Sequence, residues 1–278
     1  MSRGAPTRKL ERRWTRVGEH RIYTRFAEEP DAESPPVVLV HGFVMSGRYF
    51  LPAAERLAPF HPVYVLDLPG FGRSSKPRRV LSVPELADFL ADWMEVSGLP
   101  RAVLVGHSMG CQVITDLAAR YPERVERVVL ASPSFEPGAR TPGVQTWRLL
   151  VDLPRESFSL LPIGFRDYVG AGLFRAWRTL RSALADPIEE KLPLLRAPTL
   201  VVRGSRDPIV PQAWVEELTR LLPDGRLALI PNGPHAVNYS KAPEFVGLIR
   251  DFLASGRKIR EQAGSGSRYA ESDLLKIE

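Results

Sequence analysis

Apolar runs and amphipathic stretches alternate along most of the chain, and this alternation predicts the fold class. Six short runs are apolar at nearly every position, which is typical of strands buried on both faces of a parallel sheet. They span residues 37–40, 63–66, 102–105, 125–131, 199–203 and 227–230. Stretches between them, such as 82–96 and 212–222, have helical periodicity. The pattern predicts a doubly wound, mostly parallel α/β sheet whose strands bring their carboxyl ends to one edge.

The segment 135–195 departs from this alternation. It contains aromatic residues interrupted by prolines and glycines, and no run typical of a strand. We interpret it as a helical cap inserted after the strand at 125–131. The predicted division is a core of residues 17–134 and 196–255, a cap of residues 135–195, and flexible termini at 1–16 and 256–278.

Composition narrows the class of protein. The 278 residues are 44% hydrophobic and 25% charged, as in an ordinary globular domain with room for one insertion. No apolar run reaches the roughly 18 residues of a membrane span, and residues 1–16 lack the apolar core of a signal peptide. Cys111 is the only cysteine, which excludes intrachain disulfides and cysteine-cluster metal sites. These features predict a cytoplasmic protein without an integral membrane span.

The net charge of +6 raises the question of an anionic partner. Arginines are spread along the chain and are frequent near the termini, and no nucleic-acid-binding motif accompanies them. We therefore interpret the basic residues as a solvated surface and expect no nucleic-acid partner. Arginines also interleave with the aromatic residues of the cap, where an acidic substrate or an interface is an alternative to a solvated helix face.

A candidate nucleophile lies where the run at 102–105 ends. The sequence Gly106-His107-Ser108-Met109-Gly110 is followed by a helix-like segment. A G-x-S-x-G pattern between a strand and a helix is typical of a nucleophile elbow, a turn so tight that the serine backbone is strained. The two glycines are needed because a Cβ atom at either position would collide with the neighbouring backbone. The pattern therefore predicts Ser108 as the nucleophile.

A serine hydroxyl needs a base, and the base needs an acid that orients it. Among the five histidines, His235 alone follows a late predicted strand in a loop with no other explanation. Asp207 follows the run at 199–203, which gives the chain order serine, acid, histidine that is expected for this elbow. Asp67 also ends a predicted strand, but it precedes the elbow, and its glycine-rich loop favours a structural role.

Backbone donors and substrate contacts complete the predicted site. An oxyanion hole needs two N–H groups, and the chain offers that of Met109, after the nucleophile, and that of Phe43, in the loop after 37–40. The neighbouring His41 is expected to brace that loop through hydrogen bonds. His107 in the elbow and Trp147 and Phe174 in the cap are predicted to contact the substrate. No metal or other cofactor is expected.

Taken together, the chain resembles an α/β-hydrolase-fold serine hydrolase with an inserted cap, over roughly residues 20–254. The motifs that carry the resemblance occur in the family order: His41-Gly42, the loop 67–74, the elbow 106–110, the loop 204–207 and Gly233-Pro234-His235. Cys111 stands where many relatives have a further glycine. A serine at the nucleophile position counts against the dehalogenases and epoxide hydrolases of this fold, which the resemblance associates with an aspartate.

The expected activity is hydrolysis of a small, partly apolar carboxylic ester through an acyl-enzyme. Three alternatives stay open. Relatives that hydrolyse a carbon–carbon bond in meta-cleavage-type diketo acids resemble the chain in elbow and cap, although many have a more glycine-rich oxyanion loop. A cofactor-free haloperoxidase or perhydrolase is the second, and a ligand receptor that turns nothing over is the third. The sequence does not specify the oligomeric state.

Overall fold

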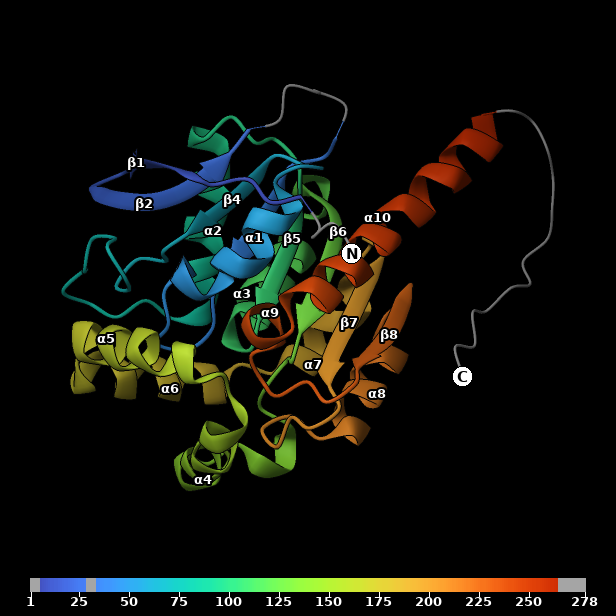
Figure 1. Cartoon of the computed structure of the whole chain (residues 1–278). Helices are drawn as coiled ribbons and strands as arrows, with labels where there is room; N and C mark the ends of the chain where they lie inside the picture. Colours follow the sequence, from blue (N-terminus) through green and yellow to red (C-terminus); the bar gives the residue numbers. More distant parts are fainter. Residues whose placement is uncertain (1–5, 29–33, 265–278) are drawn as a thin grey trace.

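One eight-stranded sheet runs through the molecule, in the spatial order β1-β2-β4-β3-β5-β6-β7-β8 (Figure 1). The computed structural model describes residues 6–28 and 34–264. The strands are β1 (Glu11–Val17), β2 (His20–Ala27), β3 (Val37–Val40), β4 (Val63–Leu66), β5 (Ala102–His107), β6 (Val125–Ala131), β7 (Thr199–Gly204) and β8 (Gly225–Ile230). From β4 to β8 all pairs are parallel, whereas β1 and β2 pair antiparallel with each other and β2 pairs antiparallel with β4. The predicted mostly parallel α/β sheet is confirmed.

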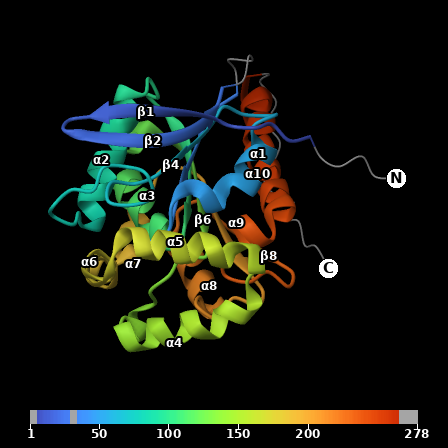
Figure 2. The same cartoon turned by 60° about the vertical axis from the view of Figure 1, so that its left-hand side comes forward.

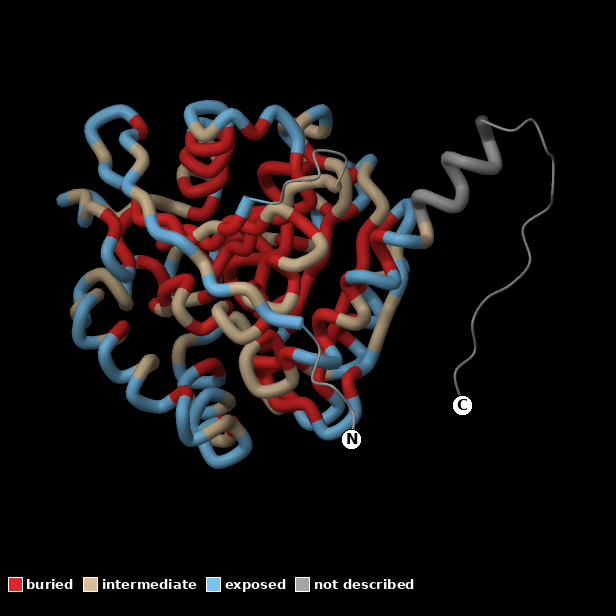
Figure 3. The backbone as a smooth tube through the Cα atoms, turned by 45° about the horizontal axis from the view of Figure 1, so that its top comes forward, coloured by how far each residue is buried: buried red, intermediate tan, exposed pale blue. Residues whose placement is uncertain are grey.

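Helices cover both faces of this sheet, which explains why its central strands are apolar at consecutive positions. On one face lie α1 (Leu51–Leu57), α9 (Val237–Ser240) and α10 (Ala242–Gly264), and on the other lie α2 (Val83–Val96), α3 (Met109–Arg120) and α8 (Gln212–Leu221). Alternate residues of β3 enter different cores, Val38 and Val40 with α2 and α3, Val37 and Leu39 with α1 and α10. Figure 3 shows the central strands buried and the outer turns of the helices exposed.

Local signals agree with these packing roles. Helix α2 begins with a capping box, in which the backbone N–H of Ser82 donates to the Glu85 carboxylate over 2.8 Å. Pro84 lies in its first turn, where its missing N–H costs no hydrogen bond. The start of this helix is therefore fixed by its own sequence.

Between β6 and β7 the chain forms helices and no strand in residues 132–198, all of which the structure describes. These helices are α4 (Pro142–Asp152), α5 (Leu161–Ala171), α6 (Leu173–Ala185) and the short α7 (Ile188–Lys191). Figures 1 and 2 both show α4, α5 and α6 on one side of the molecule, beyond the carboxyl ends of the strands. The segment between β6 and β7 is therefore helical, and it covers the edge where the candidate site residues emerge.

The structure differs from the sequence interpretation at both ends. Strand β1 begins at Glu11, so residues 11–16, which we expected to belong to a flexible terminus, form regular structure. Residues 14–17 and 20–26, divided by Gly18-Glu19, have the pattern of a hairpin, and the pairing of β1 with β2 extends it, so that Glu11 faces Phe26 and Val17 faces His20. At the other end α10 continues to Gly264, past the expected boundary at 255. The remaining expected tail, 265–278, lies outside the described residues.

Candidate active site

Ser108 lies at a strained turn between β5 and α3. Its φ of 53° and ψ of −122° are unusual for a residue with a side chain. The close approach of the turn explains both flanking glycines, since a Cβ at Gly106 would lie 2.6 Å from the Gly110 carbonyl oxygen and one at Gly110 would lie 2.4 Å from that of Val40. The expected elbow geometry is therefore present, and it holds Ser108 at the N-terminus of α3.

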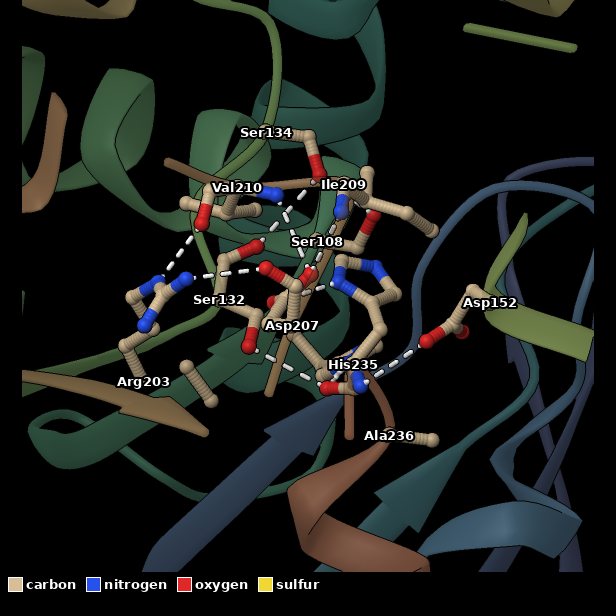
Figure 4. A network of polar contacts seen from close by, with 12 residues as sticks. Ser108, Ser132, Ser134, Asp152, Arg203, Asp207, Ile209, Val210, His235 and Ala236 are labelled. Carbon is tan, nitrogen blue, oxygen red and sulfur yellow. Dashed lines mark hydrogen bonds and ion pairs between the residues drawn. The ribbon is translucent and has the colours of Figure 1, made fainter. Parts of the chain in front are cut away.

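The hydroxyl of Ser108 has a partner that the sequence did not indicate. Its Oγ forms a 3.0 Å hydrogen bond with Oγ of Ser134, in the loop after β6. Figure 4 shows this contact beside the imidazole of His235. No hydrogen bond joins Ser108 to His235 in the described structure. Catalytic hydrogen bonds are often long or misaligned before substrate binds, so this arrangement is compatible with a resting site.

Asp207 and His235 form a direct pair between the loops after β7 and β8. Nδ1 of His235 lies 2.9 Å from Oδ2 of Asp207 (Figure 4). The other carboxylate oxygen accepts hydrogen bonds from the backbone N–H groups of Ile209 and Val210, over 2.8 and 3.0 Å. Arg203 supports this loop by donating to the carbonyl oxygens of Asp207 and Val210. The loop is therefore held in the conformation that points the carboxylate at the imidazole.

Electrostatics favour an ionised pair. Burial raises the pKa of Asp207, but the facing His235 and the hydrogen bonds to the carboxylate outweigh burial and lower this pKa below its usual value. Burial lowers the pKa of His235, yet the charge of Asp207, its hydrogen bond and the nearby Asp152 and Glu156 raise it from 6.5 to about 9. With Nδ1 bound to the carboxylate, the other ring nitrogen of His235 has no partner among the described residues, and it can accept a proton once the imidazole is neutral.

A chain of hydrogen bonds connects the oxyanion loop to the His235 loop. The N–H of Gly42 donates to the hydroxyl of Tyr49 over 2.8 Å, and that hydroxyl lies 2.8 Å from Nδ1 of His107. The carbonyl oxygen of His235 can only accept, so Nε2 of His107 carries the proton and donates to it over 3.0 Å, which leaves Nδ1 of the neutral ring to accept from the Tyr49 hydroxyl. Burial lowers the pKa of His107 to about 3. His107 is therefore a neutral bridge between two loops of the site.

The two predicted oxyanion donors are available. Neither the N–H of Phe43 nor that of Met109 has a hydrogen-bond partner among the described residues. Gly42 allows the loop to approach the elbow, since a Cβ there would lie 3.0 Å from Cβ of Ser108. Unpaired backbone donors on both sides of a serine are what a developing oxyanion requires.

Asp67 and His41 form hydrogen bonds within the loops that follow β4 and β3. Asp67 is fully buried and accepts from the guanidinium of Arg25 and from the N–H of Gly47, each over 2.8 Å. His41 accepts from the N–H of Leu68 over 2.9 Å through Nε2, which leaves Nδ1 to donate to the Gly42 carbonyl oxygen. Both side chains shape the loops after β3 and β4, and neither contacts His235.

A cavity of about 850 Å³ opens between this site and the cap. Ser108, Ser134, His107 and His235 line it together with apolar side chains of α4, α5 and α6. Trp147 and Phe174, which we expected to contact substrate, do not line it, and their side chains are 66% and 71% exposed. Each lies on the side of its helix that faces away from the cavity, which Leu149 and Trp177 line instead.

Two carboxyl groups of the cap reach the site and were missed by the sequence reading. Oδ1 of Asp152 lies 3.4 Å from the backbone N–H of His235, and Glu156 accepts from the N–H of Ala236 over 2.5 Å. Burial raises the pKa of Asp152 from 3.8 to about 7, while the charge of His235 counteracts this. Only proximity in the fold identifies these groups, because neither lies in a motif. In the described part of the chain, no cluster of three histidine, cysteine, aspartate or glutamate residues could hold a metal ion.

Known proteins resemble this chain, some of them over most of its length. A pimeloyl-[acyl-carrier protein] methyl ester esterase from Xanthomonas oryzae is 29% identical over 247 residues, which cover 80% of this chain and 96% of that enzyme. Abhydrolase domain-containing protein abhd-5.2 of Caenorhabditis elegans is 42% identical over 113 residues, but the match covers 38% of this chain and only a quarter of that protein's length, 25%.

Solved structures give the same result. A membrane phospholipase A, described as a bacterial virulence factor, superposes with a TM-score of 0.78 and 25% identity, covering 90% of this chain and 87% of that one. A thermophilic esterase from Thermogutta terrifontis superposes with a TM-score of 0.73 and 24% identity, covering 88% and 98%. The model of the alpha/beta hydrolase family matches residues 37–248. This span contains the elbow, the Asp207–His235 pair and the cap, and the chain belongs to the alpha/beta hydrolase family.

Proposed function

We propose that the protein is a serine hydrolase that cleaves uncharged carboxylic esters through an acyl-enzyme. The observation that carries the proposal is the 2.9 Å Asp207–His235 contact beside a cavity that Ser108 also lines. In the reaction, Ser108 Oγ attacks the acyl carbon while His235 takes its proton, and Asp207 stabilises the imidazolium. The N–H groups of Phe43 and Met109 bind the oxyanion. His235 then protonates the leaving alcohol, and water releases the acid by the same steps.

Cavity charge supports an uncharged substrate. Among the described residues that line the cavity there is no lysine or arginine, whereas Asp152 and Glu156 both line it. A carboxylate on the substrate would lie near two carboxyl groups with His235 as the only cation to balance them. This disfavours the hydrolysis of a dienoic diketo acid, which carries negative charge. An ester whose apolar part fills the cavity between the cap helices fits better.

The relatives point in the same direction. The Xanthomonas oryzae enzyme is, by its name, a methyl ester esterase, and the match covers 96% of that enzyme and 80% of this chain. Its ester is carried on a protein and is not itself evidence for the substrate here. What transfers is the reaction class, an esterase reaction on the same fold.

A fluorophosphonate probe tests the nucleophile. It should label the wild-type protein and leave Ser108→Ala unlabelled, with Ser46→Ala as a buried serine control that keeps labelling. Turnover of p-nitrophenyl esters then distinguishes an esterase from a receptor, which would label without turnover. A perhydrolase would show a higher rate with hydrogen peroxide and a short carboxylic acid than with any ester.

Substrate charge is tested with a matched pair of esters. p-Nitrophenyl butyrate and p-nitrophenyl hemisuccinate are similar in length, but only the second carries a carboxylate. We expect kcat/KM for the hemisuccinate to be lower by about tenfold or more, because like charges in a partly buried site repel. Equal values for the two esters would contradict the proposed preference for uncharged substrates.

A further inference from the structure

The cap exposes far more large apolar side chains than the rest of the protein. Of the sixteen that are exposed in the described part of the chain, twelve fall in residues 144–177. The extreme cases are Phe158 and Leu173, which are 87% and 89% exposed, and Phe165 is 75% exposed. Isolated exposed apolar residues are ordinary, but such a concentration marks a surface that contacts something apolar.

This apolar surface is continuous with the cavity. Six large apolar side chains both line the cavity and remain exposed: Leu149, Leu153, Leu161, Phe165, Leu173 and Trp177. They come from α4 and the turn after it, from α5 and from α6, which lie on one side of the molecule (Figure 2). The exposed residues that line the cavity are therefore mostly apolar, with Thr146 as the exposed polar residue among them.

Charge on the same segment is sorted by direction. All three acidic residues in 142–185, namely Asp152, Glu156 and Asp167, are turned toward the core and bind groups there. Arg155, Arg166, Arg178 and Arg181 are exposed, and they form no ion pair among the described residues. The surface that carries the exposed apolar side chains and these four arginines, within residues 144–181, is called the outer cap face below. Its four arginines are therefore cations without an ion-pair partner among the described residues.

We propose that the outer cap face docks onto a membrane surface that contains anionic phospholipids. Exposed aromatic and aliphatic side chains interleaved with arginines match the boundary between acyl chains and negative headgroups. A second copy fits less well, because a symmetric contact between two outer cap faces would bring the unpaired arginines together. No helix in the described part of the chain is long and apolar enough to cross a bilayer, so the contact is peripheral.

Docking in this way points the cavity entrance at the lipid. Only delivery of a lipid ester to Ser108 rests on the proposed ester hydrolysis, and the docking does not.

Vesicle flotation tests the proposal with full-length Ser108→Ala protein, which keeps catalysis out of the measurement. Vesicles of phosphatidylcholine mixed equally with phosphatidylglycerol should carry the protein, and phosphatidylcholine alone should carry much less. Arg178→Gln/Arg181→Gln should weaken binding by about 30-fold, from the contribution of each arginine near an anionic surface. Leu150→Ser/Phe158→Ser/Val169→Ser should weaken it by about tenfold or more, since this change removes apolar area. Added salt should release the protein.

Controls carry the same chemistry elsewhere. Arg101→Gln/Arg220→Gln removes two arginines, and Val96→Ser an exposed apolar side chain, away from the cap. Both should bind vesicles as the parent does. The three cap positions and two cap arginines do not line the cavity, so in the Ser108 background of the wild type these variants should keep turnover of p-nitrophenyl butyrate.

Three results would overturn the proposal: no binding to mixed vesicles, equal binding by the cap variants and the parent, or a dimer in sedimentation that the cap variants convert to monomer while vesicles bind nothing. If the wild-type protein bound vesicles but turned over no ester, the result would contradict the proposed function and leave the docking proposal standing.

Discussion

Ser134 holds the hydroxyl of Ser108, with 3.0 Å between the two Oγ atoms, while the imidazole of His235 is bound to Asp207 instead. The candidate nucleophile and its candidate base thus face one cavity with the hydrogen bond between them unmade. Proton transfer requires the Ser108 side chain to leave Ser134 and turn to His235. Breaking the hydrogen bond between Ser108 and Ser134 therefore adds a small barrier to the attack.

Removal of this competitor should therefore speed the attack. We expect Ser134→Ala to raise the rate of fluorophosphonate labelling by up to about fivefold, the equivalent of one ordinary hydrogen bond. Ser132→Ala is the matched control, because Ser132 donates to the His235 carbonyl oxygen and not to Ser108. A fall of more than tenfold in Ser134→Ala would show that Ser134 assists the reaction.

The two buried aspartates should separate catalysis from stability. Asp207→Asn leaves the imidazole without its ionic partner and should lower kcat by about 10⁴-fold, with a modest change in melting temperature. Asp67→Asn leaves the buried guanidinium of Arg25 uncompensated and should lower the free energy of unfolding by about 3 kcal/mol or more. The folded fraction of Asp67→Asn should retain a good part of its activity. Steady-state kinetics and urea unfolding on both variants check this, and equal loss of kcat in the two would overturn the choice of acid.

Activity should increase with pH. His235 must be neutral to accept a proton, and its pKa is raised to about 9 because Asp207, Asp152 and Glu156 favour the charged form over the opposing effect of burial. The acid limb of the kcat/KM profile should therefore lie above neutral pH. Asp152→Asn removes one negative charge and should move this limb to lower pH, whereas the exposed Glu217→Gln should leave it in place. A limb that shifts to higher pH in Asp152→Asn would show that Asp152 does not act through its charge.

Tyr49 should matter through its hydroxyl group alone. Tyr49→Phe keeps the ring but leaves the Gly42 N–H and Nδ1 of His107 without partners in a buried place. We expect the free energy of unfolding to fall by about 1–3 kcal/mol, with kcat reduced more than KM is changed. Tyr239→Phe, which removes a hydroxyl bound to Ser159 at the surface, is the control and should affect neither. Unchanged stability and kcat in Tyr49→Phe would mean that the bridge does not position the loops.

The proximity of Ser108, Asp207 and His235 could be predicted from the sequence because the topology of the sheet determines it. The three residues follow β5, β7 and β8, which lie within one parallel run of the sheet. Parallel strands bring their carboxyl ends to a common edge, so residues that lie far apart in the sequence become neighbours. The short list of histidines then singled out His235. Strands that are buried on both faces can also be predicted from the sequence, because they are continuous apolar runs.

The side chains of the cap that line the cavity could not be predicted in this way. Helices α4 and α6 have apolar residues on the side toward the cavity and on the side toward solvent, so periodicity could not tell Leu149 and Trp177 from Trp147 and Phe174. Ser134 belongs to no motif, and its contact arises where the loop after β6 passes the elbow. Such roles depend on which loops meet in space, and no local pattern records that.

The inward carboxylates of the cap have a mechanical consequence. Asp167 accepts from Ser46, Glu156 from Ala236 and Ser240, and Asp152 from the N–H of His235. Two of these three carboxylates, those of Asp152 and Glu156, thus bind the loop that carries the imidazole of His235. Lifting the cap from the core would break these two hydrogen bonds and leave the loop held by His107 and Ser132 through the His235 carbonyl oxygen, so opening the cavity to discharge a product would also loosen the proton acceptor.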